Sequence, residues 1–203
     1  GQADGPPAKP GATLGDSGTG MLMAISILAS LYQRKETGRG VRLGVAMQDA
    51  MLHYIRNSFG VTIKTGKPAL RAGAKTLESN NPPCDIYPCA PGGPNDYVYI
   101  YTSRGNPQHW PKLLEAIGRK DLIGDPRYET REARVEHAAE IDAILTEWTR
   151  RHDKYEAMRI IGVAVPAGAV RDTLELMNDP DFEKRGILQT IQHPTNGPFK
   201  MAG

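Results

Sequence analysis

The chain has 203 residues, with 25 Lys and Arg against 23 Asp and Glu, a formal net charge of +2, and 39% hydrophobic residues. This length holds one domain or two small ones with a buried core. Basic residues are interspersed with acidic ones, so the basic patch of a nucleic-acid-binding protein is missing. The 2 cysteines exclude a disulfide scaffold, and we expect a cytoplasmic location because nothing resembles a signal peptide.

Both ends of the sequence resemble cut ends. The chain starts without Met, in a stretch rich in Gly and Pro over residues 1–15, and it stops at residues 199–203, in a segment that has the pattern of a strand. We therefore expect a fragment of a longer protein.

The first predicted element is a helix over residues 21–35, which follows the sequence Gly-Asp-Ser-Gly-Thr-Gly at residues 15–20. Arg34 and Lys35 in the last turn complement the helix dipole. The apolar run of this helix, residues 21–32, is shorter than the roughly 20 residues that a membrane span requires. The pattern predicts a buried helix, and we expect no contact with a membrane.

A strand and a further helix are predicted next. Residues 41–47 alternate with period two, which is typical of a strand, and residues 48–59 have a helical pattern. Residues 60–83 contain few apolar side chains and several Gly, Lys and Asn. They are predicted to form a linker or flap between two structural units.

A second unit is predicted from Cys84 onward, beginning with a β-hairpin whose turn lies at residues 91–96. Its first three helices are expected at residues 111–117, 130–151 and 154–161, and an extended connection at 163–170 and a helix at 171–178 follow. The helix at 130–151 places one buried stripe at helical spacing, formed by Ile141, Ile144, Leu145 and Trp148.

Asp16 is the main candidate for chemistry. A carboxylate at a helix start lies next to unpaired backbone N–H groups and about half an elementary charge of positive dipole, which keeps it ionised. The neighbouring glycines lack Cβ atoms, so a ligand can approach the carboxylate closely. Such a group can act as a nucleophile toward an activated acyl group or as a base. The alternative is an ordinary Asp N-cap.

Other patterns are weaker. Cys84 and Cys89 are one pair of cysteines without a second pair elsewhere in the sequence. This favours structural thiols over a zinc site. Ser17 follows Asp as in a serine-protease nucleophile loop, but it leads directly into a helix. The glycines of residues 38–44 follow a helix and precede a strand, which is the reverse of the dinucleotide-binding order.

Several segments together resemble the family III CoA-transferases, the family of formyl-CoA transferase and carnitine CoA-transferase. The segments, in order, are residues 5–11, 15–20, 34–40, 45–50, 166–170, 178–180, 184–186 and 193–197. The resemblance runs through all 203 residues.

The resemblance implies that Asp16 is the catalytic nucleophile and that Gly15 and Met47 lie beside the substrate. In this family the carboxylate attacks an acyl-CoA thioester, and the reaction passes through an aspartyl anhydride and an aspartyl-CoA thioester before the acceptor acid completes the exchange. No metal and no cofactor beyond coenzyme A as substrate are expected. A core position is the alternative for Met47.

The resemblance also implies an α/β fold, with part of a Rossmann-like large domain followed by a small α+β domain, in an interlocked homodimer. Residues 1–60 would belong to the large domain, 61–83 to the linker or flap, 84–190 to the small domain, and 191–203 to the return toward the large domain. The other half of the family's usual chain would carry most CoA contacts, so we expect this fragment alone to be inactive.

Formyl-CoA transferases carry consecutive glycines ahead of the small domain, whereas residues 72–83 contain a single glycine, Gly73. The sequence therefore leaves the acid pair open. One alternative function is an α-methylacyl-CoA racemase, which uses a His–Asp pair for proton transfer, although residues 17–20 match the transferases better. The other is a non-catalytic assembly module formed by residues 84–190.

Overall fold

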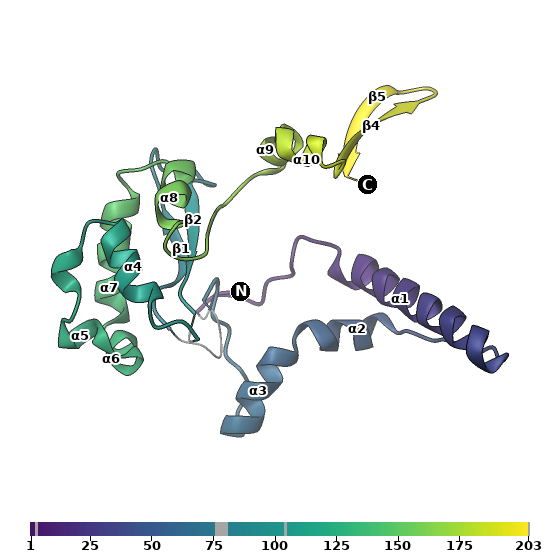
Figure 1. Ribbon diagram of the computed structural model, residues 1–203, viewed down its shortest axis with the longest axis horizontal. Coiled ribbons are helices and arrows are strands. Elements are labelled where there is room, and N and C mark those ends of the chain that lie inside the picture. Colours follow the sequence, from purple (N-terminus) through teal and green to yellow (C-terminus); the bar gives the residue numbers. More distant parts are fainter. Residues whose placement is uncertain (3, 76–80, 104, 203) are drawn as a thin grey trace. The chain divides into compact units, whose positions relative to one another are not determined.

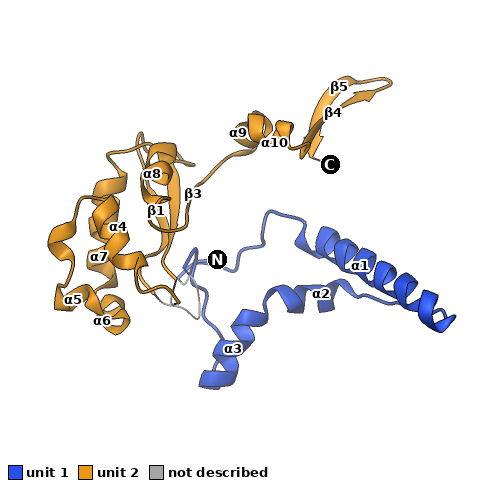
Figure 2. Cartoon of the chain, viewed as in Figure 1, with its two compact units in different colours: residues 1–80 blue, residues 81–203 orange. Residues whose placement is uncertain are grey.

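The computed structural model describes residues 1–2, 4–75, 81–103 and 105–202. The chain divides into two compact units, Gly1–Asn80 and Asn81–Gly203, which Figure 2 shows in different colours. Residues 76–80 of the predicted linker or flap lie outside the described residues, and the predicted domain boundaries stay a prediction.

The first unit contains the helices α1 (Leu14–Thr37), α2 (Met47–Tyr54) and α3 (Arg56–Thr65), drawn in purple to blue in Figure 1. Helix α1 is confirmed, although it begins at Leu14 rather than at residue 21. It ends as predicted, because Gly38 adopts a φ of 67° that favours glycine, and its N–H donates to the Arg34 carbonyl at 2.9 Å.

The predicted strand at residues 41–47 is wrong. Residues 38–46 form an extended connection, and α2 already starts at Met47. A strand requires a hydrogen-bonding partner strand, and the described residues of the first unit contain none. The predicted helix at residues 48–59 is present but divided into α2 and α3 at Ile55, and α3 continues to Thr65.

The expected burial of α1 is also wrong within this unit. Gly18 is its only buried residue, while Met21, Ile25, Leu28 and Tyr32 are 59–73% exposed. With Leu14 these side chains follow the spacing of one helix face. A sequence predicts an apolar face but not which surface covers it. By length and composition alone α1 could cross a membrane, a test that core helices also pass.

The second unit is built around a three-stranded antiparallel sheet in the order β1-β2-β3. The strands are β1 (Cys84–Pro88), β2 (Tyr97–Tyr101) and β3 (Ala167–Ala169), and the predicted hairpin is confirmed with Cys84 opposite Tyr101. In β2, Val98 and Ile100 are fully buried, whereas the alternating tyrosines are half-buried. Alternation along this strand therefore separates the core face from the outer face.

Helices pack on this sheet and enclose the core. They are α4 (His109–Ala116), the 3-10 turn η1 (Lys120–Leu122), α5 (Pro126–Glu129), α6 (Arg131–Glu136), α7 (Ala138–Thr149) and α8 (Lys154–Ile161). The prediction for 154–161 is confirmed, and the helix predicted at 130–151 is broken at His137. The predicted stripe is confirmed, because Ile141 and Leu145 are in the core and Ile144 and Trp148 pack against it.

The last segment of the chain contains the short helices α9 (Thr173–Met177) and α10 (Pro180–Lys184) and the hairpin of β4 (Leu188–His193) and β5 (Gly197–Ala202). Asp172 and Glu175 form a capping box at the start of α9. Lys154 is buried and pairs with Glu175 at 2.7 Å, which fastens α9 to α8. Helix α10 was not predicted, and it is capped by Asp179, whose side chain accepts from the Asp181 N–H, with Pro180 as its first residue.

Candidate active site

Asp16 lies in the first turn of α1, with an exposed side chain. The N-cap position belongs to Thr13, whose side chain makes no capping hydrogen bond. The alternative in which Asp16 is an ordinary N-cap is therefore wrong. The carboxylate is placed instead inside the helix, where its position relative to the positive end of the dipole is fixed by the backbone.

The surroundings of Asp16 leave its carboxylate available. Within the part of the chain that the structure describes, no hydrogen bond or ion pair engages the Asp16 side chain. Nearby polar groups are satisfied among themselves: Thr19 Oγ1 donates to the Gly15 carbonyl, and the Thr13 and Ser17 hydroxyls are 3.2 Å apart. An exposed, uncommitted carboxylate is what a nucleophile requires.

Helix α2 packs against α1 through the glycines of the 15–20 motif. A Cβ atom on Gly18 would lie 2.5 Å from Tyr54 Oη, and one on Gly15 would lie 4.0 Å from Met51 Sδ. Gly18 is therefore required for the close approach of Tyr54. Residues two apart on a helix differ by about 200° around its axis, so Asp16 projects away from the contact between Gly18 and Tyr54.

The other predicted site residues lie on these same two helices. Gly15 is half-buried beside Met51, and no atom lies near the place of a Cβ on Gly20. Met47 is the first residue of α2 and is 58% exposed, so it is not in a core within this unit. The substrate contacts of Gly15 and Met47 stay predictions.

Sequence reasoning missed two residues that hold the start of α1, namely Met51 and Tyr54. Both lie against the glycines of α1, and Ala50, one turn before Tyr54 on α2, is 2% exposed. The available signal was the helical spacing of Ala50 and Tyr54 opposite the glycine pair of α1. This spacing predicts a helix face but not which helix covers it, since the contact depends on how α1 and α2 pack.

The two cysteines of the chain lie in the second unit. Cys84 and Cys89 are both buried, Cys84 Sγ lies 3.3 Å from Tyr99 Oη, and burial raises the pKa of Cys89 to about 11. These thiols have the surroundings of structural residues. Among the described residues, no group of three or more His, Cys, Asp or Glu side chains could hold a metal ion.

Comparisons with known proteins identify the same family that the motif at residues 15–20 resembles. The sequence matches the family described as CoA-transferase family III over residues 1–203. It is 36% identical to formyl-CoA:oxalate CoA-transferase from Streptomyces avermitilis and 36% identical to that from Streptomyces coelicolor, in each case covering 98% of this chain and 51% of the relative. The chain thus spans about half the length of the curated relatives it matches.

Solved structures share the fold. A CAIB/BAIF family protein from Brucella suis is 26% identical, with a TM-score of 0.70 over 98% of this chain and 53% of that one. Rv3272 from M. tuberculosis, at 21% identity, has a TM-score of 0.77 over 98% of this chain and 50% of that one, and shows the fold alone. The predicted α/β class is confirmed.

Proposed function

Because this chain belongs to CoA-transferase family III, we propose that the whole protein transfers coenzyme A between an acyl-CoA and a carboxylic acid, with Asp16 as the nucleophile. The observation that carries this proposal is the exposed carboxylate in the first turn of α1, which no described residue engages. The reaction requires no redox change, and we propose no cofactor beyond coenzyme A as substrate.

The first half of the reaction moves CoA onto the enzyme. An Asp16 oxygen attacks the thioester carbonyl, the C–S bond breaks, and CoA leaves as a thiolate while an aspartyl anhydride forms. The thiolate then attacks the aspartyl carbonyl of this anhydride. The donor acid leaves as a carboxylate, and an aspartyl-CoA thioester remains.

The second half repeats these steps with the acceptor acid. Its carboxylate attacks the aspartyl-CoA thioester and releases the CoA thiolate, and the thiolate attacks the acceptor carbonyl of the new anhydride. The new acyl-CoA leaves, and the Asp16 carboxylate is restored. Each step exchanges one acyl bond for another, so the energy of the thioester is retained.

The start of α1 supports these steps in two ways. The positive end of the helix dipole favours the ionised carboxylate, which is the attacking form. The packing of Tyr54 on Gly18 fixes this turn from the side away from Asp16, so the carboxylate is held in position without being covered. Gly15 and Met47 would lie beside the thioester.

The relatives' names make formyl-CoA and oxalate the first pair to assay. Residues 72–83 contain only Gly73, without the consecutive glycines of formyl-CoA transferases, so related small acids belong in the same assay. We further propose that the protein acts as a homodimer in the cytoplasm.

The test is an exchange assay on the whole protein with Asp16→Asn. Loss of the charged oxygen should lower kcat by at least about 1000-fold, since the neutral amide is a poor nucleophile. Asp49→Asn is the matched control, because Asp49 is an exposed acid in the first turn of α2. Exchange that survives in Asp16→Asn would contradict the nucleophile assignment.

A second assay separates transfer from racemisation. A racemase removes and returns the α-proton, so it would incorporate deuterium from D₂O into a 2-methylacyl-CoA. The proposal predicts CoA exchange without deuterium at the α-carbon. Deuterium incorporation without exchange would favour the racemase.

A further inference from the structure

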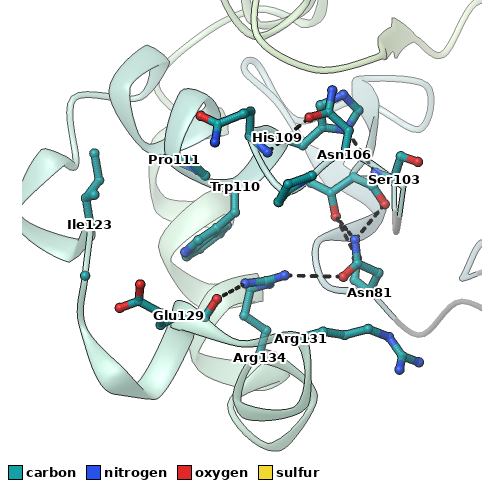
Figure 3. A pocket seen from close by; sticks show the side chains of 14 residues that line it. Asn81, Ser103, Asn106, His109, Trp110, Pro111, Ile123, Glu129, Arg131 and Arg134 are labelled. Carbon is teal, nitrogen blue, oxygen red and sulfur yellow. Dashed lines mark hydrogen bonds between the residues drawn. The ribbon is translucent and has the colours of Figure 1, made fainter.

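We propose that the unit Asn81–Gly203 contains a second binding site, a cavity of about 440 Å³ that takes a small organic carboxylate. Figure 3 shows its lining residues, which come from α4, the end of α5, α6 and the connections around them. This volume lies in the usual range for ligand sites. The site includes no residue of the unit that carries Asp16, and the proposal does not rest on the CoA-transferase mechanism.

Arg134 of α6 carries the central positive charge of the cavity. Its Nη1 donates to the carbonyls of Tyr128 and Glu129 at 2.8 and 2.9 Å, and its Nη2 to Asn81 Oδ1 at 3.4 Å. Its guanidinium lies 5.7 Å from the centre of the Trp110 ring. Among the described residues no carboxylate pairs with Arg134, and the hydrogen bonds of its guanidinium go to neutral groups.

This charge is incompletely compensated. Nε of Arg134 is buried without a hydrogen-bond partner, and so is Nε of Arg131, one turn earlier on the same helix. Burial lowers the pKa of Arg134, and the charge of Arg131 lowers it further against the opposite effect of Glu132. Arg131 pairs with Glu132 at 3.4 Å, whereas Arg134 has no carboxylate partner among the described residues, so an anion bound here would stabilise the charge of Arg134.

Neutral groups complete the polar side of the cavity. The Ser103 N–H donates to His109 Nδ1 at 2.9 Å, which places the proton of the neutral imidazole on Nε2, as a donor. Asn81 Nδ2 donates to the Thr102 carbonyl at 3.0 Å and the Thr102 hydroxyl at 3.1 Å. These bonds fix the Asn81 amide with Oδ1 toward Arg134, as Figure 3 shows.

The lining favours a carboxylate over other anions. Trp110 supplies a flat apolar wall beside the planar guanidinium, and Pro111 and Ile123 extend the apolar side. A carboxylate is planar and matches a guanidinium in geometry. Two arginines and Glu129 give the lining a formal charge of +1, which suits a monoanion better than a phosphate dianion.

The test uses the whole protein labelled with 5-fluorotryptophan and observed by ¹⁹F NMR, with sodium acetate as the probe at constant ionic strength. The Trp110 signal is assigned by its loss in Trp110→Phe. Trp148 is an internal control, because it stacks on His152 and does not line the cavity. We expect a saturable shift at Trp110 and none at Trp148, and the same shift in Asp16→Asn.

Two variants connect the shift to the arginines. Arg134→Gln should abolish saturation, but it also removes the bonds to Tyr128 and Glu129. Arg131→Gln keeps those bonds and should weaken acetate binding by roughly tenfold. Arg127→Gln is the matched control, since Arg127 pairs with Asp125 and does not line the cavity, and it should leave the affinity unchanged.

Three results would overturn the proposal. The first is a shift that rises linearly with acetate or is equal at both tryptophans, which indicates no site. The second is an acetate affinity that Arg131→Gln leaves unchanged, which removes the electrostatic basis. The third is tighter binding of inorganic phosphate than of acetate, which removes the carboxylate assignment. Weaker binding of phosphate supports it.

Discussion

The two units of this chain bury their apolar residues to very different extents. In the second unit Ile141 and Leu145 are at most 1% exposed, whereas in the first unit Ile25 and Leu28 are 62% and 68% exposed. The second unit is therefore stabilised by its own core. The first unit carries the proposed nucleophile on a helix whose large apolar face has no cover within the unit.

This difference in burial means that the residues that stabilise the chain lie mainly in the second unit, whereas the proposed nucleophile lies in the first. A self-contained core tolerates little change in volume, because its side chains are close-packed. The start of α1 depends instead on the local contacts of Tyr54 with Gly18 and of Met51 with Gly15, and on the backbone of a single helix turn. Substitutions in the two units should therefore have effects of different size and kind.

The largest effect is expected in the core of the second unit. Leu145→Ala should lower the free energy of unfolding by about 2–5 kcal/mol, because it leaves a cavity beneath the sheet. Leu28→Ala on α1 is the control and should change it by no more than about 0.5 kcal/mol. Urea unfolding of the 203-residue chain measures both, and equal effects would contradict the contrast between the units.

A smaller effect is expected where α2 packs on α1. Gly18→Ala should lower the free energy of local opening by about 1–3 kcal/mol, because its Cβ would meet the Tyr54 hydroxyl and ring and must displace them. Amide hydrogen exchange in α2 measures this opening free energy.

Gly20→Ala is the matched control for Gly18→Ala. A Cβ at this helical position meets nothing within 4 Å. Alanine should therefore strengthen the helix, by about 0.5–1 kcal/mol. Equal loss of protection in both variants would show that the contact with Tyr54 does not hold α1.

The smallest effect on stability is expected for the ion pair of Lys154 and Glu175, which joins α8 and α9. The hydrogen bond from Lys154 is the main cause that lowers the pKa of Glu175 from 4.5 to about 2. Since the folded pKa is depressed, this stabilisation is present above pH 4.5 and is lost as the pH falls toward 2. Glu175→Gln should flatten that part of the pH dependence of the urea midpoint, and an unchanged slope would contradict the assignment.

The sequence predicted the second unit better than the first, and the reason is physical. Residues 154–161 form α8 as predicted, because Asp153 caps the helix and its apolar positions fall on one face. The break at His137 was missed, since both sides of it have the same helical periodicity. Local signals specify such elements when the core that they pack on lies in the same unit.

In the first unit the same signals were misleading. Alternation over residues 41–47 predicted a strand, but no described strand of this unit pairs with them, and they form an extended connection. Asp16 was placed correctly at a helix start because its motif is local. Tyr54 was missed because its contact with Gly18 depends on how two helices pack, which periodicity does not specify.

The most direct measurement of the central claim is mass analysis of the peptide that contains Asp16. The whole protein is quenched with hydroxylamine during turnover with an acyl-CoA and is then digested. An aspartyl anhydride or thioester would be converted to the hydroxamate, so we predict added mass at Asp16 only when the acyl-CoA is present, and none in Asp16→Asn. Turnover without any such adduct at Asp16 would contradict the account.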